Sequence, residues 1–315
     1  MVHTDVMVDQ LTVEVGDRPV EISRPDKVLF PEDGITKADL ARYYARAGDD
    51  LVRHSAGRPL ALQRFPDGID AGGFFQKQAA TYFPDWIERV VVPTRKGSTD
   101  HVVLRHPADL VYLAGQGTIV PHVLLMDAAD TAEPVEVIID LDPSTPDLGP
   151  VRAGADLLRE VLTGIELVPW VKASGSRGLH VHIDIAAGGG FAASGAFATD
   201  VARVLVAADP DTFTLEFRKE DRGDRLLLDV MRNGYGQHAV APYGVRPLPR
   251  APVAAPLEWS DALAADFDPQ RWTLRNLFAG PEAWQDPWLE RSGSDTTADE
   301  AHGRLREAHA DVLGP

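Results

Sequence analysis

The stretch Glu136-Val137-Ile138-Ile139-Asp140-Leu141-Asp142-Pro143-Ser144 predicts the central strand of this chain and its reactive centre. The β-branched run Val137–Ile139 is typical of a buried strand. Because side chains alternate along a strand, Asp140 and Asp142 project from one face, and Pro143 ends the ladder. Two neighbouring carboxylates repel each other unless a cation lies between them, and hard oxygen ligands suit Mg²⁺ or Mn²⁺. The alternative is that Asp142-Pro143 only begins a turn and Asp140 is a solvated strand end.

The composition is that of an ordinary globular protein. The chain has 315 residues, 44% of them apolar and 25% charged, which is enough for one large or two modest domains. It contains no cysteine, which excludes disulfides, zinc–thiolate sites and cysteine nucleophiles. The first residues lack the pattern of a signal peptide, and no apolar run approaches the ~20 residues of a membrane span. We therefore expect a cytoplasmic protein with no membrane partner.

The net charge of −17 argues against a protein that coats nucleic acid by charge alone. The excess acid lies in residues 121–171 and 251–315, whereas the segments richest in Lys and Arg are balanced. Any nucleic-acid binding should therefore depend on specific contacts and metal ions, and should be sensitive to salt.

From residue 135 onward, the hydrophobic pattern alternates between strands and helices. It predicts helices over 151–162 and 192–208, a strand over 167–173, and a hairpin of strands 213–217 and 226–230. This order is typical of a split βαβ sheet of ferredoxin or RNA-recognition type, within an α+β fold. We expect three segments: an N-terminal α/β module (1–125), a catalytic module (126–256), and a C-terminal helical segment (257–315). The acidic tail of the last segment, from Ser292, has room for a short helix and is expected to be mobile.

A Gly/Ser-rich turn, Ser174-Gly175-Ser176-Arg177-Gly178, separates the predicted strand 167–173 from a strand that carries His180 and His182. Small residues let backbone N–H groups approach an anion, so the turn favours a triphosphate cradle. A zinc site on the two histidines is the weaker interpretation, because there is no cysteine and no third histidine at useful spacing.

Asp229 is the single carboxylate inside the apolar run 226–230, and a charge there needs a partner. A metal ion shared with Asp140 and Asp142 would supply one. Gln237 and Arg246 lie on a proline-spaced segment, 232–256, where they can complete a phosphate pocket. His122 directly precedes the acidic strand, a position where histidine is more often structural.

The N-terminal module carries further candidate contacts. Residues 11–22 alternate as a hairpin, and Thr36 is placed to cap a helix of about ten residues. Lys27 and Lys37 flank the loop before this helix and can hold a terminal phosphate, although solvated lysines would look the same. Further along, Phe74 and Phe75 precede Lys77. One ring is expected to stack on a base beside the lysine, and the other to lie in the core. A helix is expected over 109–120.

Five stretches follow one another in an order seen in one family: Pro25–Pro31, Phe74–Gln78, Asp140–Pro143, Ser174–His180 and Ala239–Arg246. Over about residues 20–290 the chain resembles the polymerase domain of bacterial DNA ligase D, in the archaeo-eukaryotic primase superfamily. The resemblance implies a template-directed nucleotidyltransferase for DNA repair by non-homologous end joining. Such an enzyme extends primers, fills gaps and ends, prefers ribonucleotides, can prime, and uses two Mn²⁺ or Mg²⁺ ions.

The resemblance also implies residue roles. The metal-binding catalytic residues would be Asp140, Asp142 and Asp229. Nucleotide binding would involve His122, Ser174, Arg177, His180, Gln237 and Arg246. DNA contacts would involve Lys27, Lys37, Phe74 and Phe75, with Lys77 added from the pattern. The implied partners are gapped or ended DNA with a 5′-phosphate, nucleoside triphosphates, a separate ligase and Ku.

The chain departs from the family pattern at three positions. Arg177 stands where many relatives have lysine, Arg24 stands where asparagine is common, and His182 is not part of the pattern. No ligase or nuclease module follows, so we interpret the chain as a stand-alone relative or an excised domain.

The implied reaction is in-line attack of a primer 3′-hydroxyl on an α-phosphate. Two alternatives use the same residues: a metal-dependent nuclease or phosphohydrolase, and a non-catalytic module that binds DNA ends. Three clustered carboxylates are costly without a metal, which argues against the second. The phosphate cradle and the strand order favour transfer over hydrolysis.

Overall fold

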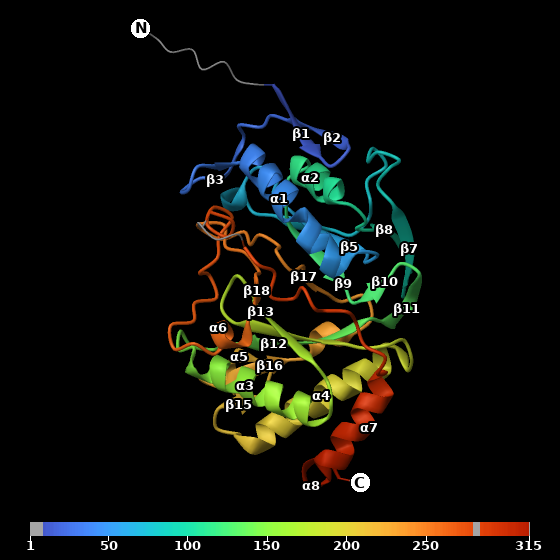
Figure 1. Cartoon of the computed structure of the whole chain (residues 1–315), viewed down its shortest axis with the longest axis vertical. Coiled ribbons are helices and arrows are strands. Elements are labelled where there is room, and N and C mark those ends of the chain that lie inside the picture. Colours follow the sequence, from blue (N-terminus) through green and yellow to red (C-terminus); the bar gives the residue numbers. More distant parts are fainter. Residues whose placement is uncertain (1–8, 280–283, 315) are drawn as a thin grey trace. The chain divides into compact units, whose positions relative to one another are not determined.

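The computed structural model describes residues 9–279 and 284–314 and divides into two compact units (Figure 1). The first unit takes residues up to Val123 together with 240–253 and 273–284, and the second takes 124–239, 254–272 and the C-terminal part. The boundary lies close to the predicted position 125. The expected C-terminal segment, 257–315, is instead shared between both units.

The first unit begins with the predicted hairpin, β1 (Gln10–Val15) and β2 (Arg18–Ser23). The short pair β3 (Val28–Phe30) and β4 (Ile35–Thr36) leads into α1 (Lys37–Ser55). Thr36 caps α1 in a reciprocal capping box with Asp39, as the sequence predicts. The helix has 19 residues, longer than expected, because its buried stripe continues to Leu51 and Ser55.

A four-stranded sheet in the order β17 (His238–Val240), β9 (Thr118–Leu124), β5 (Leu60–Arg64) and β6 (Phe74–Gln76) forms the core of this unit. Around it lie η1 (Ile69–Ala71), the ribbon β7 (Arg89–Thr94) and β8 (Gly97–Val102), and α2 (Pro107–Gly115). The expected helix over 109–120 is too long. Gly117, with φ of 81°, turns the chain into β9, whose seven residues are all buried.

The second unit contains a six-stranded sheet in the order β15 (Phe213–Thr214), β16 (Leu226–Asp229), β12 (Glu136–Asp142), β14 (Leu179–Asp184), β13 (Pro169–Ala173) and β18 (Pro256–Leu257). β14 lies between β12 and β13 and is antiparallel to both. Helix α3 (Gly149–Gly164) connects β12 to β13, and α4 (Gly190–Ala208) follows β14. This arrangement confirms the predicted split βαβ sheet.

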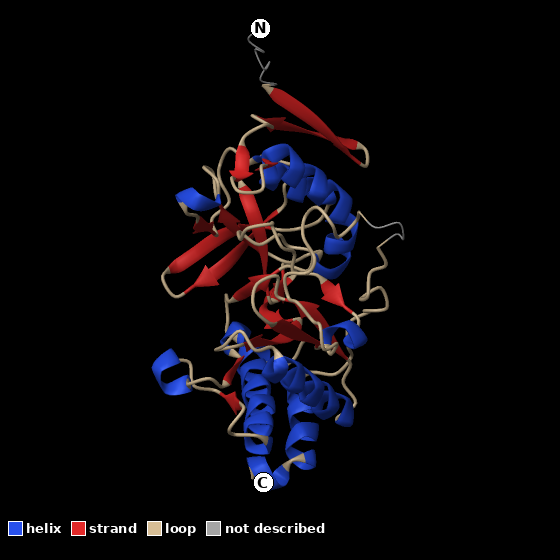
Figure 2. Cartoon of the chain, turned by 90° about the vertical axis from the view of Figure 1, so that its left-hand side faces the viewer, coloured by secondary structure: helices blue, strands red, loops and turns tan. Residues whose placement is uncertain are grey.

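The two faces of this sheet differ in character. Val137, Ile139 and Leu141 pack with α3 and α4 in one buried cluster. Figure 2 shows helices gathered on one side of this sheet. Because side chains alternate, Glu136, Asp140 and Asp142 lie on the opposite face. The short hairpin β10 (Met126–Asp127) and β11 (Asp130–Pro134) precedes β12.

The predicted hairpin of strands 213–217 and 226–230 is wrong. β15 and β16 are parallel, with Phe213 opposite Leu226. The connection between them contains a short helix, α5 (Lys219–Arg222), and is longer than a tight turn. Parallel strands require such a long connection.

The C-terminal segment also differs from expectation. Residues 257–289 hold one short helix, α6 (Trp259–Ala262), among the described positions. The acidic tail expected to be mobile folds into α7 (Ala298–Ala308) and α8 (Ala310–Leu313). Thr297 caps α7 in a capping box, and Ala301 and Leu305 are fully buried in the sheet's helical layer. The small apolar residues at helical spacing thus allow this segment to fold as a packed helix, although its composition is acidic.

Helix α4 is long and apolar enough to cross a membrane, by length and composition only, which differs from the expectation that no apolar run approaches that length. Its buried face, with Phe197, Val201 and Leu205, belongs to the core cluster of the second unit. His302 of α7 also contacts Asp200 of α4 at 2.7 Å. These contacts are those of a core helix.

Candidate active site

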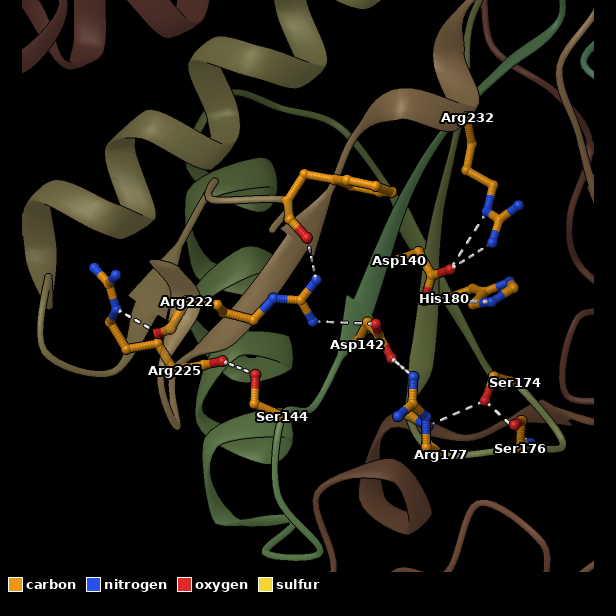
Figure 3. Close-up of polar contacts among 12 residues, drawn as sticks. Asp140, Asp142, Ser144, Ser174, Ser176, Arg177, His180, Arg222, Arg225 and Arg232 are labelled. Carbon is orange, nitrogen blue, oxygen red and sulfur yellow. Dashed lines mark hydrogen bonds and ion pairs between the residues drawn. The ribbon is translucent and has the colours of Figure 1, made fainter. Parts of the chain in front are cut away.

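The acidic end of β12 brings together residues from three strands. Asp140 lies opposite Asp229 of β16 on one side. On the other side it lies opposite His180 of β14 (Figure 3). Asp142 follows two residues later on the same face, opposite Leu227. The strand register therefore places three carboxylates and one imidazole at one end of the sheet, as the sequence predicts for Asp140, Asp142 and Asp229.

Arginine side chains bind two of these carboxylates. The Arg232 guanidinium donates to Asp140 Oδ2 at 3.2 Å, and Arg177 donates to Asp142 Oδ1 at 2.7 Å. Arg222, which is almost fully buried, contacts Asp142 Oδ2 at 3.3 Å. Burial raises the pKa of Asp140; Arg232 opposes this rise, and the neighbouring Asp229 and Asp142 reinforce it. The end of β12 is thus a place where negative charge requires a cation.

Two features shape the Ser174–Gly178 turn: hydrogen bonds to the Ser174 hydroxyl, and a close approach of Gly178 to the backbone of β12. Ser174 Oγ accepts hydrogen bonds from the backbone N–H groups of Ser176 (3.2 Å) and Gly178 (3.1 Å). A Cβ atom on Gly178 would lie 1.9 Å from the carbonyl oxygen of Leu141. Only glycine lets the turn lie this close to the end of β12, which is how Arg177 reaches Asp142.

His182 takes part in a buried ionic cluster. Its Nδ1 lies 2.9 Å from Glu136 Oε2, and Arg291 binds Glu136 (2.7 Å) and Asp184. Burial lowers the pKa of His182 to about 4, so the ring is neutral near pH 7. The side-chain nitrogen Nε1 of Trp288 donates to the carbonyl of Val171 at 3.0 Å and its ring packs on His182. These contacts fasten the segment 285–291 to the sheet, and they give His182 a structural role.

Across the described residues, no three His, Asp or Glu side chains are gathered so as to hold a metal ion. The donor chemistry nevertheless fits a hard divalent cation, since Asp140, Asp142 and Asp229 supply only carboxylate oxygens. In this structure arginines compensate the charge of Asp140 and Asp142, while burial, reinforced by the neighbouring Asp229 and Asp142, raises the pKa of Asp140.

The other expected nucleotide ligands lie elsewhere in the chain. Gln237 is in the second unit, where its backbone N–H donates to Gly234 O at 3.1 Å. His122 and Arg246 belong to the first unit. His122 is buried on β9, with its ring 5.1 Å from that of Phe75. The backbone N–H of Arg246 donates to Pro252 O at 2.7 Å.

Lys27 and Lys37 are neighbours in the first unit, because Lys37 N donates to Lys27 O at 2.9 Å. Lys27 Nζ pairs with Asp67 at 2.6 Å. Lys37 is 5% exposed, so it is not an ordinary solvated lysine, and its Nζ donates to Ser23 O at 2.8 Å. Burial, followed by the charges of Arg24 and Lys27, lowers the pKa of Lys37 to about 8. This is a compact cationic cluster.

Phe74 and Phe75 are exposed at 50% and 48%, so the expectation that one of them lies in the core is wrong. Both lie on β6, an edge strand of its sheet. Arg64 lies 5.8 Å from the Phe74 ring. Lys77, also exposed, follows the strand directly.

Residues 36–288 match the family described as "LigD, primase-polymerase domain". The chain belongs to this family. It is therefore a nucleotidyltransferase of the primase-polymerase class, and the resemblance inferred from the sequence is confirmed.

Curated relatives and a solved structure agree with this membership. A "Multifunctional non-homologous end joining protein LigD" of Mycolicibacterium smegmatis is 31% identical over 77% of this chain and 32% of its own length. The Bacillus subtilis "Bifunctional non-homologous end joining protein LigD" is 29% identical over 79% of this chain and 40% of its own length. The polymerase domain of Mycobacterium tuberculosis Ligase D, solved in complex with DNA, matches with a TM-score of 0.73 and 27% identity over 91% of this chain and 94% of that one. The chain thus spans about a third of the LigD length in the first of these relatives.

Sequence reasoning identified Arg177 but missed the other two arginines that contact Asp140 and Asp142. Arg222 lies in a charged connection that resembles a solvated loop, and Arg232 follows the Asp229 strand without any periodic signal. Asn233 was missed as well. Its side-chain amide donates to Ile138 O at 2.7 Å and accepts from Ile138 N at 2.8 Å. The Asn233 side chain thereby satisfies the backbone N–H and C=O groups of Ile138, beyond the point where β16 ends.

Gly178→Ala tests the close approach of the phosphate turn to β12. The added Cβ would meet the Leu141 carbonyl oxygen at 1.9 Å, so the turn must move. We expect the free energy of unfolding in urea to fall by about 1–3 kcal/mol or more. Gly164→Ala in α3 is the matched control, because nothing lies within 4 Å of its added Cβ. Equal stability of the two variants would contradict the geometry described for the turn.

Proposed function

We propose that this chain extends primers and fills short gaps or ends in DNA by template-directed nucleotidyl transfer, with ribonucleotides preferred over deoxynucleotides. The observation that carries the proposal is the placement of Asp140, Asp142 and Asp229 at one sheet end, against the Ser174–Gly178 turn. Carboxylates beside a turn rich in backbone and hydroxyl donors suit phosphoryl transfer, because one set holds cations and the other holds phosphate oxygens.

Asp140, Asp142 and Asp229 would hold Mn²⁺ or Mg²⁺, two ions in the proposed reaction. When bound, such ions lower the pKa of the primer hydroxyl and neutralise charge on the phosphates. Ser174, Arg177 and His180 would orient the triphosphate, with Gln237, His122 and Arg246 as further ligands. Arg177 and Arg232 each hold a carboxylate in this structure, and a guanidinium that leaves a carboxylate is a strong donor to phosphate. The 3′-oxygen forms a bond to the α-phosphorus, and the bond to pyrophosphate breaks.

The DNA would be held in part by the first unit. The Lys27–Lys37 cluster has the charge to bind a 5′-phosphate, and Phe74 and Phe75 present exposed rings for bases next to Lys77. The Mycobacterium tuberculosis domain was solved in complex with DNA, which supports DNA as a substrate for this chain, and we propose that this DNA is gapped or ended. We also propose a separate ligase and Ku as partners in end joining. An enzyme that acts on the ends of chromosomal DNA would carry out this reaction in the bacterial cytoplasm.

Primer extension tests the proposed reaction most simply. A labelled primer is extended across a short gap bearing a 5′-phosphate, with Mn²⁺ and with ribo- and deoxynucleotides in parallel. We expect templated products, with ribonucleotides incorporated faster. Asp140→Ala should lower the rate more than about 100-fold, because the loss of a metal ligand costs more than the loss of its neighbours. Asp156→Ala, an exposed aspartate on α3, is the control and should leave the rate unchanged.

The alternatives give different products in the same assay. Shortening of the labelled strand would indicate a nuclease. Binding of the gap by a folded protein without any product would leave a DNA-end-binding module.

The pKa of Lys37 predicts how 5′-phosphate recognition depends on pH. Lys37 titrates at about 8 in the folded protein, below its ordinary value of 10.5, so its charge is present below pH 8 and lost above it. Affinity for a gapped duplex with a 5′-phosphate should fall as pH rises through 8. The same duplex with a 5′-hydroxyl is the control and should show little change. A Lys37→Met variant that keeps the full pH-dependent difference between the two duplexes would refute this role.

A further inference from the structure

Lys172 is a fully buried lysine next to the active site. It lies on β13 directly opposite His180 of β14, with a relative exposure of 0%. Its Nζ is 3.0 Å from Nδ1 of His180. Lysines are rarely buried to this degree unless a partner holds the ammonium group. The contact between Lys172 and His180 is therefore a feature of the site that calls for an explanation.

The chemistry of this contact fixes where the imidazole carries its proton. In its ammonium form Lys172 has three N–H donors and no acceptor, so with this form Nδ1 of His180 accepts the hydrogen bond. An Nδ1 atom that accepts carries no proton, and the single proton of the neutral ring is then on Nε2. Nε2 is the atom that faces the acidic end of β12, 3.6 Å from Asp140 Oδ1.

His182, two residues further along β14 on the same face, has the opposite arrangement. Its Nδ1 lies 2.9 Å from Oε2 of Glu136, a carboxylate that also binds Arg291 and can only accept. The proton of His182 is therefore on Nδ1. The two rings lie 6.2 Å apart and nearly parallel. One strand thus holds two histidines whose Nδ1 atoms face opposite kinds of partner, an ammonium group at His180 and a carboxylate at His182.

We propose that Lys172 is a positioning residue that fixes the Nε2–H tautomer of His180 and so presents a hydrogen-bond donor to the triphosphate of the incoming nucleotide. This inference rests on the proposed function. In the other tautomer, Nε2 would turn a lone pair toward an anionic phosphate oxygen, and the contact would be repulsive. Lys172 itself touches neither nucleotide nor metal; its effect passes through the ring of His180 (Figure 3 shows that ring beside Asp140).

The tautomers can be read directly by ¹⁵N NMR of the imidazole nitrogens in the full chain. We expect His180 as the Nε2–H form and His182 as the Nδ1–H form, the second serving as an internal contrast in the same spectrum. Lys172→Met should remove the preference at His180 and leave His182 unchanged. A wild-type His180 in the Nδ1–H form, or protonated on both nitrogens, would overturn the proposal.

A double-mutant cycle tests the consequence for the nucleotide. Lys172→Met should weaken nucleoside triphosphate binding about tenfold, as the loss of a hydrogen bond to a charged group does, and should raise KM more than it lowers kcat. His180→Gln carries an amide N–H₂ donor that needs no lysine to orient its protons. Lys172→Met should therefore have little further effect in the His180→Gln background.

Equal losses from Lys172→Met in both backgrounds would mean that the lysine acts through packing, which would contradict the proposal. Binding is measured by titration calorimetry with the triphosphate, separately from primer extension. A protein that binds with the expected coupling but extends no primer would overturn the proposed function and leave the Lys172–His180 coupling intact.

Discussion

The requirement to compensate negative charge at the end of β12 is the constraint on which the rest of the site depends. Strand alternation places Asp140 and Asp142 on one face, and the pairing of β12 with β16 adds Asp229 across the strand. Burial of Asp140 makes its ionised form costly, as the raised pKa shows. Three arginines from three different segments approach this face: Arg177, Arg222 and Arg232. In the structure these guanidinium groups compensate the negative charge of Asp140 and Asp142, at the place where we propose that metal ions bind.

The elements around this face of β12 keep the acidic side chains in position. The helical layer buries the odd-numbered side chains of β12, which leaves the even-numbered ones to the reacting face. Asn233 completes the pairing of β12 where β16 stops, and Gly178 lets the phosphate turn lie against Leu141. Farther along the same face, the Glu136–Arg291–Asp184 cluster is closed by the C-terminal segment, so that the polar side chains there are paired rather than hydrated.

Much of this arrangement could be predicted from the sequence, because it depends on local rules. The two-residue spacing of Asp140 and Asp142 fixes a common face, the small residues of 174–178 indicate a turn, and Thr36 marks a helix start. What the sequence did not predict depends on tertiary contacts. The partners of Arg222 and Arg232 follow from the path of the connection between β15 and β16, which has no periodicity. The exposure of both Phe74 and Phe75 depends on which neighbouring elements cover the two faces of β6, and the local sequence does not specify these. A short helix in the acidic tail was expected, but its packing was not, because the burial of Ala301 and Leu305 depends on tertiary contacts within the second unit.

The measurement that tests the account most directly is Mn²⁺ binding, followed by the electron paramagnetic resonance signal of the free ion in the presence of a nucleoside triphosphate. If Asp140, Asp142 and Asp229 form the cation site, the wild-type protein binds Mn²⁺ and Asp229→Ala binds it far more weakly. Arg232→Met should bind it more tightly than wild type, because a competing cation has been removed from Asp140. Equal Mn²⁺ affinity of the wild type and Asp229→Ala would contradict the account, since the carboxylates at the end of β12 would then not be the place where the ion is held.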